Sequence, residues 1–515
     1  MKKNIKIKKN KKVMVVMAIP LCLAASSSVH ALNFALGEQA SLNWDTTVRY
    51  TAAQRIADQD DRLLSNVNGD DGNRAFDRYS LIKNRFDVIT EADLNFGEVG
   101  PFYDLGAFAR ARAWYDGVYN RSNDHDSPAT SNNVSVPFNE FTEATRKQHG
   151  DDVEMLDYFV YAGADLAGHD TTLRVGSQAL NWGETLFLLG GVATSQGPVD
   201  ATGFNQPGSE LKELFMPVEQ VAFQTSLTDS ISVEAYYQWE WEKHRLDAAG
   251  SYFSTADIID AGGESLILAP GVAFGRGDDQ SAKDSGQWGV AVRFLVEELA
   301  GTEFGLYYIN YHDQLPQVTL DMANGQYFLD YAEDVHLWAA SFGTVIGSTN
   351  VSGEISYREN APVGVKDVAN PFAWDRAELM HYSLSAIHIF GANSLMDNLS
   401  ITAELGADHV LDKSNEELSK DKFAYGYALT LKPTWFEALP GLDVNLPISL
   451  SQGVNGDSAM GGSFVEGSNK VGVTLDLLYQ QKYQAQLGYV NYFGGASSNS
   501  KNDRDYISLA LKYAF

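Results

Sequence analysis

The stretch that decides the fold is residues 506–515, which reads YISLALKYAF. Every second residue in it is apolar: Ile507, Leu509, Leu511, Tyr513 and Phe515. Successive side chains of a β-strand point to opposite faces, so one face is apolar and the other small or polar. A chain that ends this way, on an aromatic residue, is typical of outer-membrane β-barrels, whose last strand pairs with the first. We predict that Tyr513 and Phe515 form the assembly signal for the barrel-assembly machinery. The last strand of a secreted β-sandwich is the alternative.

The first 31 residues have the three parts of a secretory signal peptide. Residues 1–12 carry seven lysines and no acid, residues 13–25 are apolar, and Val29 and Ala31 suit a cleavage site. The apolar run is shorter than the roughly 20 residues of a membrane-spanning helix. We expect cleavage after Ala31, which removes Cys22, the only cysteine. Residues 32–515 would then form one barrel domain without disulfides.

The composition suits an exported barrel. Without the seven lysines, 31 basic residues remain against 67 acidic ones, a net charge of −36, which argues against nucleic acid as a partner. Mean hydropathy is mildly polar at −0.23, as expected when half of each strand and all the loops face water. We expect an integral protein of a Gram-negative outer membrane, surrounded by lipid and lipopolysaccharide.

Alternating segments of roughly 10 residues recur along the whole chain. There are about 18 of them (16–18), starting near residues 41, 84, 102, 154, 171, 218, 230, 286, 303, 334, 350, 378, 397, 422, 441, 468, 482 and 504. Short connections alternate strictly with long ones, as periplasmic turns and extracellular loops do in these barrels. The sequence therefore predicts an all-β fold, a single transmembrane antiparallel β-barrel wide enough for an aqueous channel.

The strand faces opposite the apolar ones carry many charges. The predicted pore-lining or constriction residues are Arg85, Arg110, Arg112, Arg174, Arg293, Arg358, Glu234 and Glu354. An arginine facing lipid costs about 2–4 kcal/mol at the midplane, so these side chains are expected to point inward. Facing carboxylates across a narrow pore, they would sort solutes by charge. The alternative, given equal weight, is that they pair with neighbouring acids and stiffen the wall.

Residues 182–217 are unusually apolar for an external loop, with LFLL at residues 186–189. Such a loop should bury itself, and the barrel interior is the available place. We predict a lumen-folded loop that forms a constriction or plug, with Trp182, Glu184, Pro198, Pro207 and Glu210 as its marker residues. A loop packed over the barrel mouth is the alternative.

Long motifs give the chain a family resemblance. They include RVGSQALNWGET (residues 174–185), GPVDATGFNQPGSELKE (197–213), MPVEQV (216–221) and DRDYISLALKYAF (503–515). The chain resembles a proteobacterial outer-membrane family catalogued as domain of unknown function 1302. The resemblance implies a barrel, with genes kept beside an outer-membrane lipoprotein and an RND-type exporter in settings linked to hydrophobic compounds. It implies no catalytic residues, and Ser177 stands where the family motif carries an arginine.

No catalytic motif stands out in the chain. The histidines form no H-x-x-x-H or H-E-x-x-H pattern and no G-x-S-x-G elbow occurs, so we predict no enzyme, no catalytic or metal site and no cofactor. Residues 58–61 and 70–71 make an acidic first loop, which could hold Ca²⁺ or bridge divalent ions to lipopolysaccharide. Without EF-hand spacing, a solvated loop is favoured.

The function predicted from these features is an outer-membrane channel for passive passage of small, hydrophobic or amphipathic solutes. One alternative is a plugged barrel that serves as partner of a periplasmic lipoprotein and an RND-type exporter. A second is a surface structural or adhesive barrel. A gap beside residues 182–217 would favour the channel and a sealed lumen the plugged barrel. Adhesion requires exposed aromatics on external loops, such as Tyr252, Phe253 and Tyr327.

Overall fold

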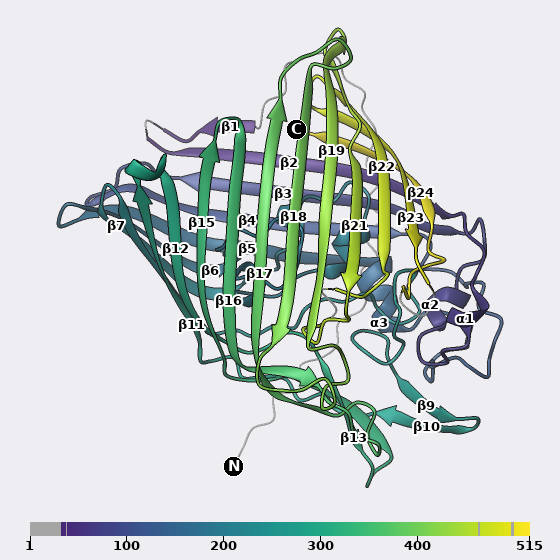
Figure 1. Ribbon diagram of the computed structural model, residues 1–515. Helices are drawn as coiled ribbons and strands as arrows, with labels where there is room; N and C mark the ends of the chain where they lie inside the picture. The colour runs from purple at the N-terminus through teal and green to yellow at the C-terminus, as the bar shows by residue number, and fades with distance from the viewer. Residues whose placement is uncertain (1–31, 38, 462–463, 496–498) are drawn as a thin grey trace, which may run out of the picture.

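The computed structural model describes residues 32–37, 39–461, 464–495 and 499–515. The predicted signal peptide, residues 1–31, lies outside the described residues. Within these ranges no helix has both the length and the apolar character needed to cross a membrane. The described chain is dominated by long antiparallel strands that wrap into one sheet (Figure 1).

The main sheet is a closed antiparallel β-barrel of 18 strands, as predicted. In ring order the strands are β2 (Ser41–Arg55), β3 (Leu81–Asn95), β4 (Phe102–Asp116), β5 (Asp151–Leu166), β6 (His169–Gln178), β7 (Val218–Thr228), β8 (Ile231–Gln238), β11 (Gln287–Val296), β12 (Thr302–Tyr311), β15 (Val335–Ile346), β16 (Thr349–Gly364), β17 (Trp374–Phe390), β18 (Asn398–Val410), β19 (Phe423–Leu439), β20 (Leu442–Asn445) continued by β21 (Ile448–Asn455), β22 (Asn469–Tyr479), β23 (Tyr483–Phe493) and β24 (Tyr506–Ala514). The ring closes because β24 pairs with β2, from Thr47 opposite Ala514 to Arg55 opposite Tyr506.

The closing strand shows how alternation builds the wall. Ile507, Leu509 and Leu511 of β24 are 38–44 % exposed, whereas the intervening Ser508 and Ala510 are buried. In a barrel the exposed apolar face is the one that contacts lipid, and the other face lines the interior. The face predicted for residues 506–515 is therefore confirmed.

Short turns and long loops alternate around the ring, which confirms the predicted pattern. The turns include residues 96–101, 167–168, 229–230, 297–301, 347–348, 391–397, 440–441 and 480–482. The nine long connections are loops 1 to 9, in order residues 56–80, 117–150, 179–217, 239–286, 312–334, 365–373, 411–422, 456–468 and 494–505. The C-terminus lies at the short-turn end (Figure 1).

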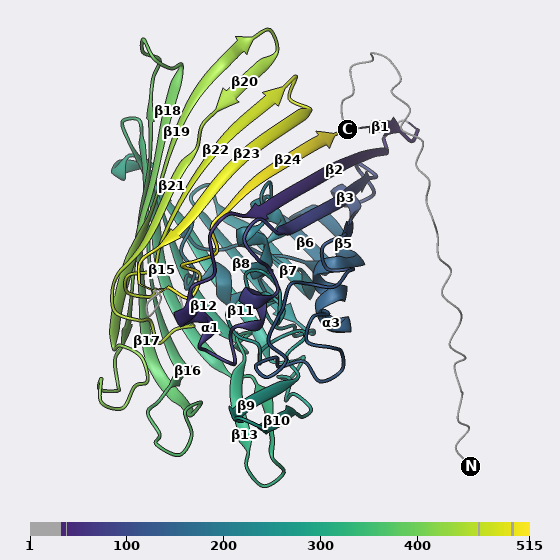
Figure 2. The same cartoon turned by 90° about the vertical axis from the view of Figure 1, so that its right-hand side faces the viewer.

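Some short strands escaped prediction. Strand β1 (Leu32–Ala35) pairs with the first residues of β2, beyond the point where β24 ends. Loops 4 and 5 contribute β9 (Ser265–Ala269), β10 (Val272–Arg276), β13 (Gln317–Asp321) and β14 (Gln326–Asp330), which form a separate four-stranded sheet. Figure 2 shows this sheet beyond the barrel, at the end away from the C-terminus. Strands of four or five residues are too short for alternation to distinguish them from loop.

Loops 1, 2 and 4 pack together inside the long-loop end of the barrel. Their shared apolar cluster contains Phe76 of loop 1, Tyr119 and Phe141 of loop 2, and Tyr252 of loop 4. Tyr506 of β24 belongs to the same cluster, so the loops are anchored to the wall as well as to one another. Short helices α1 (Asp61–Leu64), α2 (Asp71–Arg74) and α3 (Glu143–Thr145) lie in loops 1 and 2.

Candidate functional site

Loop 3 (residues 179–217) crosses the barrel interior. Its first part binds β16 and β18, and its second part binds β2, β4 and β24. Strands β2 and β16 lie on opposite sides of the ring, because nine strands separate them in one direction and seven in the other. A segment bonded to both walls has to pass between them, through the lumen.

Two wall carboxylates hold the first part of loop 3 by its backbone. Glu354 of β16 accepts hydrogen bonds from the N–H groups of Glu184 (2.9 Å) and Val192 (2.7 Å). Glu404 of β18 is fully buried and accepts from the N–H groups of residues 186, 187 and 188, at 2.5–3.0 Å. Hydrogen bonds from N–H groups to ionised carboxylates are roughly twice as strong as neutral ones. The loop therefore follows the inner wall from β16 to β18.

Arg358 of β16 holds the same part of the loop as a hydrogen-bond donor, whereas Glu354 and Glu404 act as acceptors. Its guanidinium donates to the carbonyl oxygens of Gly190 (2.6 Å) and Gly191 (3.1 Å) and to the hydroxyl of Ser195 (3.1 Å). Within the described ranges Arg358 makes no ion pair with a carboxylate. Gly190 has φ +112°, and a Cβ there would lie 2.5 Å from Cε of Met460, so this position requires glycine.

The second part of loop 3 is held by charges on β2, β4 and β24. Arg49 of β2 pairs with Glu213 through two hydrogen bonds of 2.9 Å and also donates to the carbonyl of Gly208 (2.8 Å). Arg110 of β4 donates to the carbonyl of Lys212 (3.1 Å). Lys512 of β24 forms an ion pair with Glu210. These four contacts fix the loop against the wall that contains the closing seam of the barrel.

Asp200 is the charged centre of loop 3. Its Oδ2 lies 3.2 Å from Nη2 of Arg112 on β4 and 3.0 Å from Nη1 of Arg245 in loop 4. Glu154 of β5 pairs with the same two arginines, at 3.0 and 2.6 Å. Burial acts to raise the pKa of Asp200, but the nearby Arg245 and Arg112 charges outweigh it, and the pKa lies below the ordinary aspartate value. Asp200 therefore stays ionised and joins loop 3 to loop 4.

Trp182 anchors the start of loop 3. It is 4 % exposed, packs against Tyr236 and Tyr307, and donates from Nε1 to Glu234 (2.7 Å). Glu234 also accepts from Nε of Arg293 (2.9 Å). These contacts join the loop to β8, β11 and β12.

The remaining marker residues of the lumen loop have smaller structural roles. Glu184 is half-buried, and this burial raises its pKa. The carbonyl of Pro198 accepts from the N–H of Met216 (2.9 Å), which links the two arms of the loop. Pro207 lines a small cavity.

Seven of the eight predicted pore residues are bonded to loop 3 or to a neighbouring wall carboxylate. Arg85 pairs with Asp87 (2.7 Å) and Arg110 with Asp157, so pairing with nearby acids accounts for much of their charge. Arg174 differs: it is exposed on the inner face of β6, and among the described residues it has no ion-pair partner. The role of these residues in lining a pore stays a prediction.

Two adjoining cavities lie where loops 2, 3 and 4 meet the inner wall near β2, β3, β4 and β24. They have volumes of about 20 Å³ and about 10 Å³, close to the roughly 10–15 Å³ needed for one water. Residues shared by both are Arg85, Thr202 and Gln206. The larger one is also lined by Lys83 and Phe253. Each gap therefore admits about one water molecule.

Several residues that hold loop 3 were not among the predicted site residues, notably Arg49, Glu404, Asp200, Glu213 and Arg245. Alternation places Arg49 and Glu404 on inner faces, and Asp200 and Glu213 fall within the long motif at 197–213. No feature of the sequence around Arg245 indicates that this residue of loop 4 pairs with Asp200 of loop 3. The sequence therefore contained a signal for four of these five residues.

The prediction of a solvated acidic first loop is wrong for residues 70 and 71. Asp58 and Asp61 are exposed as expected, but Asp70 is fully buried and Asp71 is 4 % exposed. Loop 4 covers them, and Asp257 of that loop accepts the backbone N–H of Asp71 (3.0 Å). A local sequence gives no information about such a cover from a distant loop.

Solved structures similar to this chain include three outer-membrane proteins. Acinetobacter baumannii OccAB4 has 13 % identity and a TM-score of 0.45, covering 93 % of this chain and 98 % of that one. Pseudomonas aeruginosa OpdK with vanillate has 11 % identity and a TM-score of 0.44, and P. aeruginosa OccK2 (OpdF) in complex with glucuronate has 10 % and 0.43, each covering 92 % of this chain and 98 % of the other. No curated protein matches the chain. The family described as "Protein of unknown function (DUF1302)" matches residues 12–515, and this chain therefore belongs to the DUF1302 family.

Proposed function

We propose that the protein is an outer-membrane channel through which small solutes pass passively, and that loop 3 sets the width of the passage. The observation that carries this proposal is the course of loop 3 from the Glu354 wall to the Arg49 wall. A ring of 18 strands encloses an aqueous lumen unless a segment folds inside it. Loop 3 is such a segment, so its position decides what passes.

The way loop 3 is held supports a movable constriction. Many of its contacts with the wall are hydrogen bonds and ion pairs from Arg49, Glu354, Arg358 and Glu404. Such bonds can break one at a time, whereas a large apolar interface would have to be opened as a whole. The two one-water gaps beside the loop are the places where a small displacement would first widen the passage.

The larger gap also supports the predicted solute class. Tyr119, Phe253 and Tyr506 give it apolar and aromatic surface, and Lys83 and Arg85 add positive charge. If a displacement of loop 3 widened this gap, the lining would offer apolar surface and positive charge to a solute with an apolar body and a polar or anionic group. We therefore propose small amphipathic or hydrophobic solutes as the cargo.

The structure bears differently on the two alternative functions, a plugged barrel and a surface adhesive barrel. A plugged barrel would also have narrow gaps beside loop 3, so we keep the plugged barrel as a second proposal. The two proposals differ in whether the protein conducts without a partner. Adhesion required exposed loop aromatics, but Tyr252 is 1 % exposed and Tyr327 is fully buried. Phe253 is only partly buried, however, and Tyr79 of loop 1 is 59 % exposed, so the loop aromatics do not separate adhesion from a channel.

A liposome-swelling assay tests the proposed function. Purified protein in vesicles is exposed to pairs of solutes of similar size, one amphipathic, such as benzoate, and one strongly polar. We expect swelling with both and a higher rate for the amphipathic member. No swelling above protein-free vesicles, under conditions where the barrel is folded, would contradict a channel that works alone and would support the plugged barrel.

A further inference from the structure

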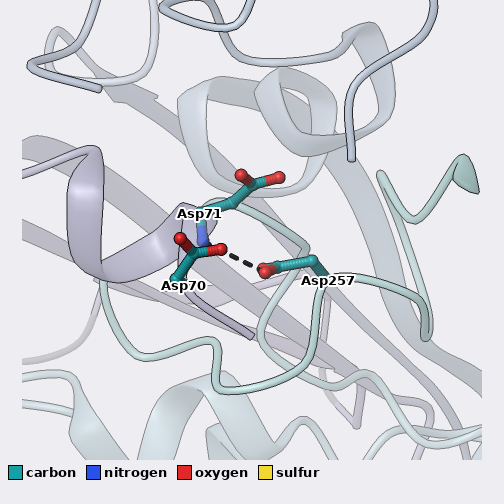
Figure 3. A group of neighbouring side chains, drawn as sticks. All are labelled: Asp70, Asp71 and Asp257. Atoms are coloured by element: carbon teal, nitrogen blue, oxygen red, sulfur yellow. Dashed lines mark hydrogen bonds between the residues drawn. The ribbon is translucent and has the colours of Figure 1, made fainter. Parts of the chain in front are cut away.

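Three buried aspartates from two distant loops meet outside the loop 3 site. Asp70 and Asp71 belong to loop 1 and Asp257 to loop 4, and their exposed fractions are 0 %, 4 % and 0 %. Each offers one carboxylate oxygen such that all three oxygens lie within 4.8 Å of one another. Figure 3 shows the carboxylates of Asp70 and Asp257 directed toward one another, next to the backbone nitrogen of Asp71, and the carboxylate of Asp71 directed away from them.

Within the part of the chain that the structure describes, two oxygens of this group have no hydrogen-bond partner. Oδ2 of Asp70 accepts from Nε of Arg74 (2.5 Å), and Oδ2 of Asp257 accepts from the N–H of Asp71 (3.0 Å). The other oxygen of each, Oδ1 of Asp70 and Oδ1 of Asp257, is buried and unpaired. Leaving a buried acceptor without a hydrogen-bond partner is unfavourable, and more so when the acceptor is charged. A buried carboxylate oxygen without a hydrogen-bond donor therefore indicates that another group binds at this position.

The nearby cations do not balance the three carboxylates. Arg74 pairs with Asp70 but also with the exposed Asp126 (3.0 Å). Among the described residues Asp257 has no ion-pair partner. The guanidinium of Arg504 faces other groups, donating to the carbonyls of Gly72 (2.6 Å) and Ser254 (3.3 Å). The described cations therefore leave this group of carboxylates incompletely paired, and a bound cation would complete the pairing.

We propose that Asp70, Asp71 and Asp257 bind one Ca²⁺ ion that ties loop 1 to loop 4. Calcium takes oxygen ligands at about 2.3–2.6 Å, so ligands on opposite sides lie about 4.6–5.2 Å apart. Mg²⁺ holds its ligands at about 2.0–2.1 Å and would require a tighter group. Soft or nitrogen-preferring metals do not suit an all-carboxylate set. Water completes the coordination shell.

Asp71 can serve the ion while it keeps its present bonds. Its Oδ1 contacts Nε2 of His125 (2.8 Å) and its Oδ2 accepts from the N–H of Asn132 (3.0 Å), both in loop 2. Each carboxylate oxygen has two lone pairs, so one remains for the cation. The ion would thereby lock loops 1, 2 and 4 together at the long-loop end of the barrel, where they share the apolar cluster.

Calcium titration of the full chain tests this site. The protein is refolded in detergent free of lipopolysaccharide, so that no lipid phosphate binds the ion, and titrated calorimetrically with Ca²⁺ and with Mg²⁺. We expect one Ca²⁺ per chain, binding at least about tenfold tighter than Mg²⁺, and a higher unfolding temperature that EDTA reverses. No binding up to about 10 mM Ca²⁺ would overturn the proposal, as would equal affinity for both ions.

A matched pair of variants locates the ion. Asp257→Asn keeps an acceptor for the N–H of Asp71 and removes one ligand charge, so Ca²⁺ affinity should fall at least about tenfold. Asp61→Asn removes an exposed carboxylate from loop 1, outside the proposed ligand set, and should leave the affinity within about twofold. Asp70→Asn replaces Asp257→Asn if the latter does not form a barrel by circular dichroism. Unchanged affinity in the ligand variant would place the ion elsewhere and refute the site.

Discussion

Arg49 of β2 and Glu213 of loop 3 form a two-bond ion pair inside the barrel, with Nη1–Oε1 and Nη2–Oε2 distances both of 2.9 Å. Arg49 is 1 % exposed, so the pair is shielded from water and salt. Bidentate pairs of this kind fix orientation as well as distance. The pair joins the strand that closes the ring to the far arm of the loop that crosses it.

Glu213→Gln should loosen this arm of loop 3. Removing one member of a buried ion pair lowers the free energy of unfolding by about 3–5 kcal/mol. We expect the lower end of this range, because Arg49 still pairs with Asp87 at 3.4 Å. We expect a lower free energy of unfolding in urea and larger, noisier single-channel currents. Glu210→Gln, which removes a more exposed ion pair with Lys512, is the control and should change both quantities less. Identical currents in wild type and Glu213→Gln would contradict a structural role for the pair in the passage.

Glu354→Gln should release the first arm. The substitution weakens the two charge-assisted hydrogen bonds from the N–H groups of Glu184 and Val192, each of which contributes about 1.5–3 kcal/mol. The fraction of molecules in which this part of loop 3 is detached from the wall should therefore rise at least about tenfold. Val192 is fully buried, and the chain without residues 1–31 has no cysteine, so Val192→Cys provides a labelling site. We expect thiol labelling of Val192→Cys to accelerate when Glu354→Gln is added.

Glu303→Gln is the control for this experiment, because Glu303 is a half-exposed acid on β12 whose ion-pair partner among the described residues is Arg293. It should leave the labelling rate unchanged. Equal acceleration by both substitutions would show that any loss of luminal charge opens the loop, against a specific tether at Glu354.

His149 should make stability depend on pH. Burial, and then the charge of Lys83, lower the pKa of His149 to about 3. Its Nε2 accepts the N–H of Ala248 (3.2 Å), which requires the neutral ring. An unfolded histidine binds its proton below about pH 6.5 and the folded one does not until about pH 3. Stability is therefore lost as pH falls through this window, by up to about 1.4 kcal/mol per pH unit.

His149→Gln keeps a hydrogen-bond acceptor that does not titrate, so its free energy of unfolding should fall less steeply between about pH 6 and 4. His169→Gln, at the half-exposed first residue of β6, should retain the wild-type slope. Urea titrations at several pH values measure these slopes. A His149→Gln slope equal to that of wild type would mean that this ring is protonated in the folded protein.

Arg174→Ala should shift ion selectivity toward cations. Arg174 is exposed inside the barrel and, within the described ranges, has no ion-pair partner, so its full charge acts on passing ions. Reversal potentials under a salt gradient measure the change, and Arg174→Lys, which keeps the charge, should preserve the wild-type value. An unchanged reversal potential in Arg174→Ala would remove this residue from the passage.

Local alternation was sufficient to predict the barrel, because the wall depends on which residue of each pair faces lipid. It was not sufficient for the interior. Glu404 meets the backbone of loop 3 across more than 200 residues of chain, and Asp257 covers Asp71 across 186. Such contacts are fixed by how loops of different strands fold into one space. The acidic residues at 70 and 71 therefore looked solvated, although in the structure they are among the most buried charges.

The most direct test of the central claim is single-channel conductance in a planar bilayer, comparing the intact protein with a deletion of residues 185–208. This deletion removes the Glu404-bound segment and Asp200 and leaves the strands of the ring in place. If loop 3 sets the width of the passage, the intact protein conducts in small or intermittent steps and the deletion gives large, steady conductance. Equal conductance in the two proteins, with both shown to be folded barrels, would contradict the account.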